Sequence, residues 1–393
     1  MASDMARAAE ASRAEEENII LDAIEKFLER EVAPYAHDLE KDDVYPEEIV
    51  EGMKALGLFG AIIPEEYGGL GLGAATYARI VERMARVWMS ITGIYNSHLI
   101  MASALVRHGT EAQRREWLPR FATGEIRGGL ALTEADGGTD LQSAVRTVAR
   151  REGAGYVING TKTWISNGIH GQCFALLVKT DPDALPRHRG MSLFLAEKGE
   201  GFTVSRKLEK LGYKGIDSAE LVFEDYFVPA DRLVGGEEGR GLQHALGGLE
   251  LGRINIAARG VGVAQASLDE AVRYAQVRKS FGKPICEHQA IQMKLADMAT
   301  QVESARLLVE RAAAAFDRGE RCDMEAGMAK LAGSEAAIFC SLESMRVHGG
   351  YGYSKEFNVE RFYRDAPLLA IGEGTNELQR ILIARQLIAR NPV

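Results

Sequence analysis

The order of secondary-structure signals along this 393-residue chain limits its fold more than any single motif does. Helical periodicity fills the first part, short strand-like segments fill the middle, and long helical patterns return afterwards. Doubly wound folds alternate strands with helices, so separate blocks of helices and strands argue against that class. We therefore expect an α+β multidomain protein, with a helical domain over 1–125, an antiparallel β domain over 126–235 and a second helical domain over 236–393.

The outer blocks are assigned from apolar residues that recur at helical spacing between charged ones. Before the middle block, amphipathic helices are predicted from about residue 15 and over 47–59, 75–108 and 111–122. After it, Ala-, Leu-, Glu- and Arg-rich helices are predicted over 241–277, 287–318 and 324–348. The middle block instead holds GGLAL, RTVAR, GYVIN, CFALLVK, MSLFLAE and AELVFEDYFV. These segments are short, rich in β-branched and aromatic residues and separated by turn residues, which is typical of antiparallel strands.

Composition excludes several classes of protein. The net charge of −9, from 47 basic and 56 acidic residues, argues against a nucleic-acid-binding protein with a basic face. The four cysteines lack zinc-ligand spacing, so we expect reduced thiols, no metal and a cytoplasmic protein. The opening MASDMARAAEASRAEEEN is acidic and has no apolar core, so no targeting segment is expected. No apolar run reaches about 18 residues, so no membrane span is expected.

Three glycine-rich stretches have different interpretations. GGLGLG after Tyr67 has Thr76 where the third glycine of a dinucleotide loop should fall, so a plain turn between helices is favoured. RGVGVAQ lies inside a helical pattern, where its glycines would permit close helix packing. HGGYGY ends a helical pattern, and two interpretations remain open for it. It is either a glycine-mediated helix end or a backbone surface that a ligand approaches closely.

Three other segments carry chemistry. ALTEADGGTD is a predicted strand that runs into a Gly-rich loop, and INGTKTWISNG is predicted to be a hairpin turn with Trp164 and Ser166 on one side. An indole beside hydroxyls and free amides suits a flat, polar-edged heterocycle. LLAIGEGTNELQR places Glu373 between two glycines, after an apolar run and before the last helix. Each segment alone has a simpler explanation. Trp164 would be a core residue, and Glu373 would be a first-turn acid favoured by the helix dipole.

Together, in this order, these segments resemble the acyl-CoA dehydrogenase family. The resemblance covers residues 15–390 and includes IPEEYGGLGLG, LVFEDYFVP, YAQVRKSFGKPI, LADMATQVESARLL, MRVHGGYGY and FYRDAPLLAIGEGTNELQR. LELGRINIAARGVGVAQ and GMAKLAGSEAA are most similar to short-chain members. The resemblance implies an N-terminal helical domain, a central β-barrel-like domain and a C-terminal four-helix bundle. It also implies non-covalent FAD, a homotetramer, a role in fatty-acid β-oxidation and electron-transfer flavoprotein as electron acceptor.

The resemblance also implies roles for particular residues around FAD. The flavin ring would lie against Leu132, Thr133, Trp164 and Ser166, with Gly138 and Thr139 near the ribityl chain and pyrophosphate. The cofactor of a neighbouring subunit would be reached by Arg278, Ser280, Phe281, His288, Gln289, Arg346, Val347, Gly349 and Gly350. The pyrophosphate would be held at the start of the last helix by Thr375, Asn376 and Glu377, since helix N-termini favour anions. The chain departs from the family pattern at Ala135, Asp136, Lys214 and Arg346.

The implied reaction is α,β-dehydrogenation of an acyl-CoA thioester to the trans-2-enoyl-CoA. Glu373 would remove the α-proton, and the β-hydrogen would leave as hydride to flavin N5. The apolar approach to Glu373 would desolvate the base, and Gly374 would admit the thioester. The N–H of Glu373 and a ribityl hydroxyl would polarise its carbonyl. Some relatives carry the base before the arginine of LELGR, but that position here is Gly252.

The substrate contacts implied by resemblance are Thr139, Glu250, Arg253 and Gly374. Glutaryl-type members have an arginine near the start of the helix that lines the acyl pocket, where this chain has Val87, Trp88 and Met89. A dicarboxyl-CoA is therefore disfavoured, and a short straight or short branched acyl chain is predicted. The alternatives are an acyl-CoA oxidase, flavin hydroxylase, nitroalkane oxidase or desulfinase on the same fold, or a non-catalytic DNA-associated relative.

Overall fold

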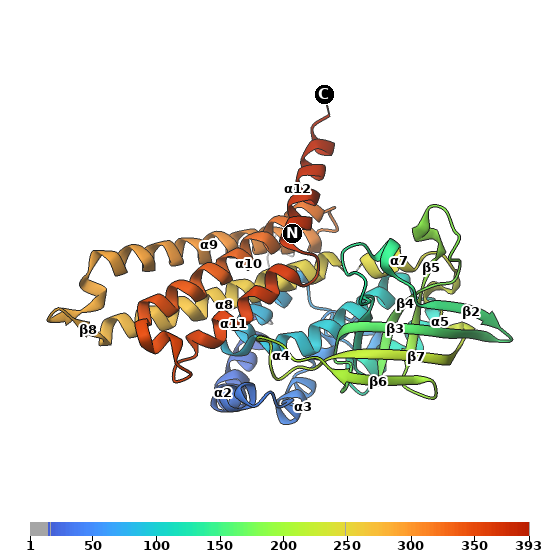
Figure 1. Cartoon of the computed structure of the whole chain (residues 1–393), viewed down its shortest axis with the longest axis horizontal. Coiled ribbons are helices and arrows are strands. Elements are labelled where there is room, and N and C mark those ends of the chain that lie inside the picture. Colours follow the sequence, from blue (N-terminus) through green and yellow to red (C-terminus); the bar gives the residue numbers. More distant parts are fainter. Residues whose placement is uncertain (1–14, 16, 248, 393) are drawn as a thin grey trace, which may run out of the picture.

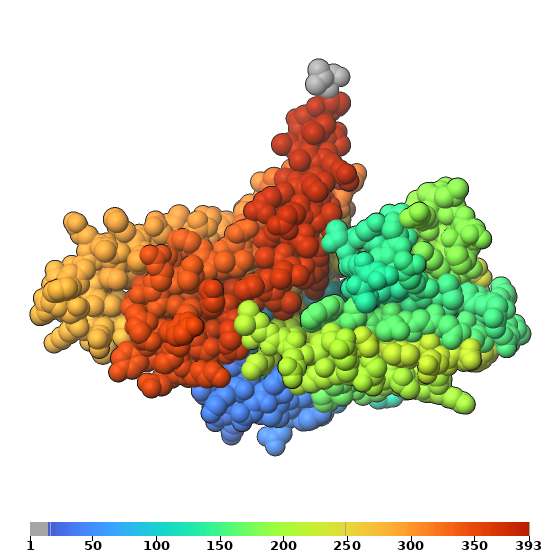
Figure 2. All heavy atoms as spheres, viewed as in Figure 1, coloured from blue at the N-terminus to red at the C-terminus, as the bar shows by residue number. Residues whose placement is uncertain are grey.

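The computed structural model describes residues 15, 17–247 and 249–392. Long helices lie side by side at one end of the molecule and a curled sheet forms the other, with helix α4 running between them (Figure 1). The last helix, α12, projects from the body (Figures 1 and 2). This arrangement confirms the α+β fold class, with helices before and after a central sheet.

The N-terminal helices agree closely with the predicted periodicity. A non-helical residue, Trp88, bends α4 within its length, with φ −155° and ψ 106°. The guanidinium of Arg361 from α11 donates to the carbonyl of Val87 beside this bend, at 2.8 Å. The elements are η1 (Leu28–Val32), α2 (Ala33–Lys41), α3 (Glu47–Ala55), η2 (Leu58–Gly60), η3 (Glu65–Tyr67), α4 (Ala74–His108) and α5 (Glu111–Ala122).

The central sheet has seven strands in the order β1-β4-β2-β3-β7-β6, with β5 paired to β4. Most pairings are antiparallel, as predicted, but β4 runs parallel to both β1 and β2. Sequence reasoning found six of these strands and missed β6. The elements are β1 (Gly128–Ala131), α6 (Leu141–Ala144), β2 (Val148–Glu152), β3 (Gly155–Ser166), β4 (Cys173–Lys179), η4 (Arg187–Gly190), β5 (Met191–Glu197), β6 (Phe202–Lys207), β7 (Ser218–Pro229), η5 (Ala230–Arg232) and η6 (Val234–Gly236).

The predicted hairpin turn in INGTKTWISNG was wrong, because the segment continues as the single strand β3. Its pairing with β7 shifts register between Ile158 and Gly160 and again between Lys162 and Ile165. Gly160 has φ +151°, and a Cβ at this position would lie 2.4 Å from the Thr147 hydroxyl. The Asn-Gly pair therefore marks a bulge against a neighbouring segment rather than a chain reversal.

The C-terminal helices form a bundle in which α10 packs against α8, α9, α11 and α12. The helix predicted over 241–277 is two helices in the structure. Gly260 lies so close to α10 that a Cβ would meet the Gly333 carbonyl oxygen at 2.3 Å, which confirms close packing at RGVGVAQ. The elements are α7 (Gly241–Leu246), α8 (Leu249–Val277), β8 (Lys279–Ser280), β9 (Lys283–Pro284), η7 (Ile285–Glu287), α9 (Gln289–Asp317), α10 (Asp323–His348), η8 (Gly349–Tyr353), α11 (Val359–Ile371) and α12 (Asn376–Arg390).

The searches for membrane spans and metal clusters cover only the described residues. Within them, no helix is long and apolar enough to cross a bilayer. The same residues contain no cluster of three or more His, Cys, Asp or Glu side chains suited to a metal ion. Most of the opening segment, on which the expectation of no targeting sequence rests, lies outside them.

A buried ion pair fixes the loop after β1 to strand β3. The ammonium of Lys162 lies 2.7 Å from the Glu134 carboxylate and is fully buried. Glu134 also accepts hydrogen bonds from the hydroxyl and N–H of Thr147 and from the N–H of Arg146. The pair therefore holds the ALTEADGG loop against the bulged part of β3.

Replacing Lys162 with Met should destabilise the protein by about 3–5 kcal/mol, because the Glu134 carboxylate would stay buried without its cation. Lys54→Met is the matched control, since its pair with Glu51 is solvent-exposed and should contribute no more than about 1 kcal/mol. Urea unfolding followed by circular dichroism measures both changes. Equal losses in the two variants would show that the buried pair does not stabilise this loop.

Candidate functional site

Glu373 lies in the tight connection between α11 and α12. Its backbone has φ +52°, a left-handed conformation that is unusual for a residue with a side chain, and Gly374 follows with φ +89°. The Thr375 hydroxyl caps α12 by accepting from the N–H of Leu378 at 3.3 Å. The connection thus turns the Glu373 side chain inward immediately before the helix begins.

The two carboxylate oxygens of Glu373 have different surroundings. Oε1 accepts a hydrogen bond of 3.0 Å from the side-chain amide of Asn96 on α4. Oε2 is buried without a hydrogen-bond partner in the described structure, and it faces Gly252 on α8. A Cβ at Gly252 would lie 2.3 Å from Oε2. The position where some relatives carry their base is therefore a glycine that makes room for this carboxylate.

A buried chain of hydrogen bonds fixes the orientation of Asn96. The Asn255 amide donates to the Tyr77 hydroxyl at 2.8 Å, and that hydroxyl donates to Asn96 Oδ1 at 2.9 Å. Because Asn96 Oδ1 is the acceptor, its amide nitrogen must point the other way, toward Glu373. The chain Asn255–Tyr77–Asn96–Glu373 therefore runs in one direction and leaves Oε2 as the free basic oxygen.

The electrostatics around Glu373 favour a base of raised pKa. Burial raises the pKa of this carboxyl above the usual 4.5, against the opposing effects of Arg259, the Asn96 hydrogen bond, Lys330 and Arg253. A carboxylate in water would bind the α-proton of a thioester poorly, so a raised pKa suits proton abstraction.

The side chain of Asn376 belongs to a buried hydrogen-bond network. Its Oδ1 accepts from the Lys330 ammonium and the Ser334 hydroxyl, both at 2.9 Å, and its amide donates to Glu335 at 3.1 Å. The side chain of Asn376 thus ties the start of α12 to α10. The Asn376 side chain is therefore engaged, whereas the first backbone N–H groups of α12 have no partner within the helix.

The residues implied to face the flavin meet at one edge of the sheet. The N–H of Thr163 donates to the carbonyl of Thr133 at 2.9 Å, which places the end of β1 beside the β3 bulge. Trp164 occupies this bulge with φ +61° and is 58% exposed. Leu132, next to Thr133, and Ser166, two residues after Trp164, are half-buried. Gly138 and Thr139 are exposed, and Gly138 lies against Thr133. An exposed indole in a left-handed conformation is not a core residue, so the simpler explanation for Trp164 fails.

Helix α4 connects this sheet edge to Glu373. Asn167, next to Ser166, donates through its amide to the carbonyl of Ile94 at 2.8 Å and to that of Gly128 at 2.9 Å. Two residues beyond Ile94, Asn96 holds Glu373. A single stretch of α4 therefore fixes both the β3 end and the carboxylate.

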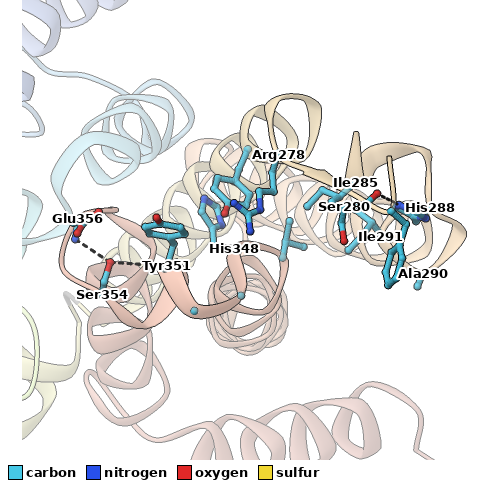
Figure 3. A pocket seen from close by; sticks show the side chains of 15 residues that line it. Arg278, Ser280, Ile285, His288, Ala290, Ile291, His348, Tyr351, Ser354 and Glu356 are labelled. Carbon is cyan, nitrogen blue, oxygen red and sulfur yellow. Dashed lines mark hydrogen bonds between the residues drawn. The ribbon is translucent and has the colours of Figure 1, made fainter. Parts of the chain in front are cut away.

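A second group of implied residues lines a cleft of about 740 Å³ (Figure 3). Its walls come from the end of α8, the β8–β9 hairpin, the start of α9 and the α10–η8 junction. Gln289 is exposed at the start of α9, and Arg346 pairs with Glu343; neither lines the cleft. The residues that the resemblance implied for the cofactor of a neighbouring subunit and that do line the cleft are Arg278, Ser280, Phe281, His288, Val347, Gly349 and Gly350. Gly349, with φ +60°, ends α10, which confirms the glycine-mediated helix end, whereas the approach of a ligand to this segment stays a prediction.

The predicted substrate contacts Glu250 and Arg253 lie near the start of α8. Burial and a hydrogen bond to Asp323 raise the pKa of Glu250 to about 7. Arg253 has a buried Nε without a partner in the described structure, and its charge opposes the raised pKa of Glu373. The contacts of Glu250 and Arg253 with a substrate stay a prediction.

Sequence reasoning did not identify four side chains around this carboxylate: Tyr77, Asn96, Asn255 and Arg259. Each lies within an apolar helical segment and is buried. A polar residue on the apolar face of a helix is the signal that could have found them, because buried polar groups require partners.

Family comparisons match almost the whole chain. The N-terminal, middle and C-terminal domains of acyl-CoA dehydrogenase match residues 14–125, 129–226 and 239–388, respectively. An acyl-CoA dehydrogenase of Bacillus subtilis is 40% identical over 93% of this chain and 96% of its own length. Human short-chain specific acyl-CoA dehydrogenase is 40% identical over 95% of this chain and 90% of its own length. A (2S)-methylsuccinyl-CoA dehydrogenase of Cereibacter sphaeroides is 38% identical over 95% of this chain and 70% of its own length.

The fold comparison agrees with these matches. The structure of butyryl-CoA dehydrogenase from Megasphaera elsdenii superposes with a TM-score of 0.91 at 34% identity, covering 95% of this chain and 98% of that one. These relatives are oxidoreductases that act on acyl-CoA thioesters. The chain belongs to the acyl-CoA dehydrogenase family.

Proposed function

We propose that this protein catalyses FAD-dependent α,β-dehydrogenation of a short straight or short branched acyl-CoA to its trans-2-enoyl-CoA. The observation that carries the proposal is the Glu373 carboxylate, held through Oε1 and left with a buried, unpartnered Oε2. Such an oxygen can accept a proton without first breaking a hydrogen bond.

The residues present fit an FAD molecule. The exposed Trp164, with Thr133 and Ser166, would hold the isoalloxazine ring, and the N–H groups at the start of α12 would favour the pyrophosphate. The cleft containing Arg278 and Gly349 would receive the cofactor of a neighbouring subunit. When bound, FAD supplies the two-electron acceptor for the substrate.

The chain itself supplies binding and proton transfer. Glu373 Oε2 takes the α-proton, while Asn96 keeps Oε1 fixed so that the free oxygen does not rotate away. The backbone N–H of Glu373 polarises the thioester carbonyl, Arg253 lies near the base, and Glu250 approaches the pantetheine arm of the substrate. The dry surroundings of the carboxylate exclude water, which strengthens each of these electrostatic effects.

Other members of the family support the finer assignments. The short-chain preference follows the names of the human and Megasphaera relatives.

A homotetramer is supported by the projecting α12, whose Ile381, Leu387 and Ile388 are exposed and would be covered by another subunit. Electron-transfer flavoprotein is proposed as the electron acceptor, and the free cysteines agree with a cytoplasmic protein.

Changing Glu373 to Gln should abolish anaerobic bleaching of the flavin by acyl-CoA, because the amide cannot accept the α-proton. The variant should still retain FAD, which its visible spectrum reports. Glu200→Gln, an exposed residue after β5, is the matched control and should bleach normally. Unchanged bleaching in Glu373→Gln would refute the assignment of the base.

Changing Asn96 to Ala should move the pH dependence of flavin reduction to higher pH. The Asn96 hydrogen bond lowers the pKa of Glu373, so its loss raises that pKa further. Because the reaction needs the ionised base, the rate rises as pH passes through this pKa, and the variant needs a higher pH to reach its plateau. Stopped-flow bleaching across pH measures the shift. A slower rate with an unmoved profile would mean that Asn96 only supports the fold.

Butyryl-, isobutyryl-, isovaleryl- and octanoyl-CoA tested together should separate the chain-length alternatives. We expect the fastest bleaching with a short acyl chain, as the names of the short-chain specific and butyryl-CoA relatives suggest. Preference for octanoyl-CoA would refute the short-chain proposal. Rapid reoxidation of the reduced flavin by oxygen would favour an oxidase over a dehydrogenase.

A further inference from the structure

Lys330 on α10 is a fully buried cation that the proposed reaction does not use. Its ammonium donates to the carbonyl of Ala370 at 3.3 Å and to Oδ1 of Asn376 at 2.9 Å. Both acceptors are neutral, although burying a charge is costly unless an opposite charge accompanies it. An apolar side chain of similar length would avoid this cost, so stability alone does not account for a lysine at this position.

The two acceptors lie on either side of the connection that carries the base. Ala370 belongs to the last turn of α11, Asn376 is the first residue of α12, and Glu373 lies midway between them in the sequence. Gln379 holds the same connection from within α12, because its amide donates to the Gly374 carbonyl at 3.2 Å. Since Glu373 and Gly374 both have positive φ, such contacts are needed to keep the connection in this conformation.

The ammonium comes from a rigidly packed part of α10. Lys330 lies one turn before Gly333, where a Cβ would be 2.6 Å from the carbonyl oxygen of Ala257 on α8. Helix α8 also contributes Gly252, which Oε2 of Glu373 faces. The bridge from α10 therefore fixes the connection relative to the helix against which the carboxylate lies.

The charge of Lys330 acts on the base from a distance. Burial lowers the pKa of Lys330 to about 8, so its ammonium is largely charged at neutral pH. This charge lowers the pKa of Glu373, as do the charges of Arg259 and Arg253, although burial still raises that pKa overall. The charged groups that act on the ammonium in turn are Glu373 in the connection, Glu377 on α12, Arg253 on α8 and Glu335 on α10.

We propose that Lys330 is a positioning residue for the base. It bridges the end of α11 and the start of α12, and it thereby holds the connection that directs the Glu373 carboxylate toward Gly252. This inference rests on the proposed function, in which Glu373 removes the α-proton, and adds a residue that acts through the connection rather than on the substrate. A reacting group has to keep its position to within about 0.5 Å, which a connection of two positive-φ residues does not ensure by itself.

Changing Lys330 to Met removes the bridge and the charge together. At saturating acyl-CoA, flavin reduction should slow by roughly 10–100-fold, because a displacement of about 1 Å at a reacting group costs up to that much. The half-saturating acyl-CoA concentration should stay the same, since the proposal gives Lys330 no contact with the substrate. The rate should reach its plateau at higher pH, because losing a cation raises the pKa of Glu373 and the reaction needs the ionised base. Stopped-flow bleaching across pH measures all three quantities.

Changing Asn376 to Leu breaks the bridge and leaves the Lys330 charge in place. Leucine has nearly the shape of asparagine but cannot accept the ammonium's hydrogen bond. Reduction should again be slower, with a smaller shift in the pH profile than in Lys330→Met. In both variants the backbone amides of 371–375 should exchange with deuterium faster than in the wild-type holoprotein without substrate, which mass spectrometry measures.

Arg364→Met is the matched control, because it removes ion pairs elsewhere on α11 and leaves both contacts of Lys330 intact. It should lower the stability of the protein without moving the pH profile or the exchange of 371–375. If Lys330→Met slows reduction only as much as Arg364→Met, with neither pH profile moved, Lys330 is a structural residue and the inference is overturned.

The remaining outcomes separate this inference from the proposed function. Unmoved exchange and an unmoved pH profile in Lys330→Met would overturn the inference and leave Glu373 assigned as the base. Bleaching by no acyl-CoA would instead refute the proposed function, and the exchange of 371–375 would still test the bridge. If Lys330→Met does not fold, Asn376→Leu decides the question, since unchanged rate and exchange in that variant would also overturn the inference.

Discussion

The hydrogen bond from Asn96 to Glu373 joins the parts of the molecule that have to work together. Asn96 belongs to α4, which packs against α8 on one side and β1 on the other. The same stretch of α4 accepts the Asn167 amide at the end of β3, beside the proposed flavin face. The proposed base on the C-terminal block and the proposed flavin face on the sheet are therefore both anchored to the same stretch of α4.

Two non-glycine residues of the proposed site have backbone conformations that are unusual for a residue with a side chain. Trp164 and Glu373 both have positive φ, at +61° and +52°, although neither is glycine. Such conformations persist only where the surroundings fix them. At Trp164 the β3 bulge and the Lys162–Glu134 pair do so, and at Glu373 the Thr375 cap and the Asn96 hydrogen bond do so. In both cases the positive φ points the side chain away from the direction that it would take in a regular strand or helix.

Local sequence signals predicted most of the helices and strands because periodicity and turn residues act over short distances. The helix over 111–122 and the strands CFALLVK and MSLFLAE were assigned with their observed bounds. The errors arose where a distant segment decides the local conformation. Gly160 resembles a turn residue but is a bulge against Thr147, and Trp88 bends α4 where Gly215 and Arg361 pack against it.

The separation of partners along the chain also explains which residues of the site could be predicted from the sequence. Glu373 was found because its flanking glycines and apolar approach are contiguous in the chain, and the resemblance to a family gave it a role. Asn96, Tyr77 and Asn255 were missed because their partners lie 19 to 277 residues away along the sequence. Their hydrogen-bond directions exist only after α4 and α8 have packed.

The balance of charge around Glu373 explains why its surroundings contain several cations and still favour a strong base. Arg259, Lys330 and Arg253 all stabilise the carboxylate, yet burial outweighs them and the pKa stays raised. The stabilising effect of Lys330 on the Glu373 carboxylate is reduced, because burial lowers the pKa of Lys330 to about 8 and its ammonium donates to Asn376 instead. Arg259 keeps its charge, but its hydrogen bonds go to Tyr213 and Thr92 rather than to the base. These cations act on Glu373 from a distance, and within the described residues none forms a direct ion pair with it, so Oε2 has no partner, as the proposed role of base requires.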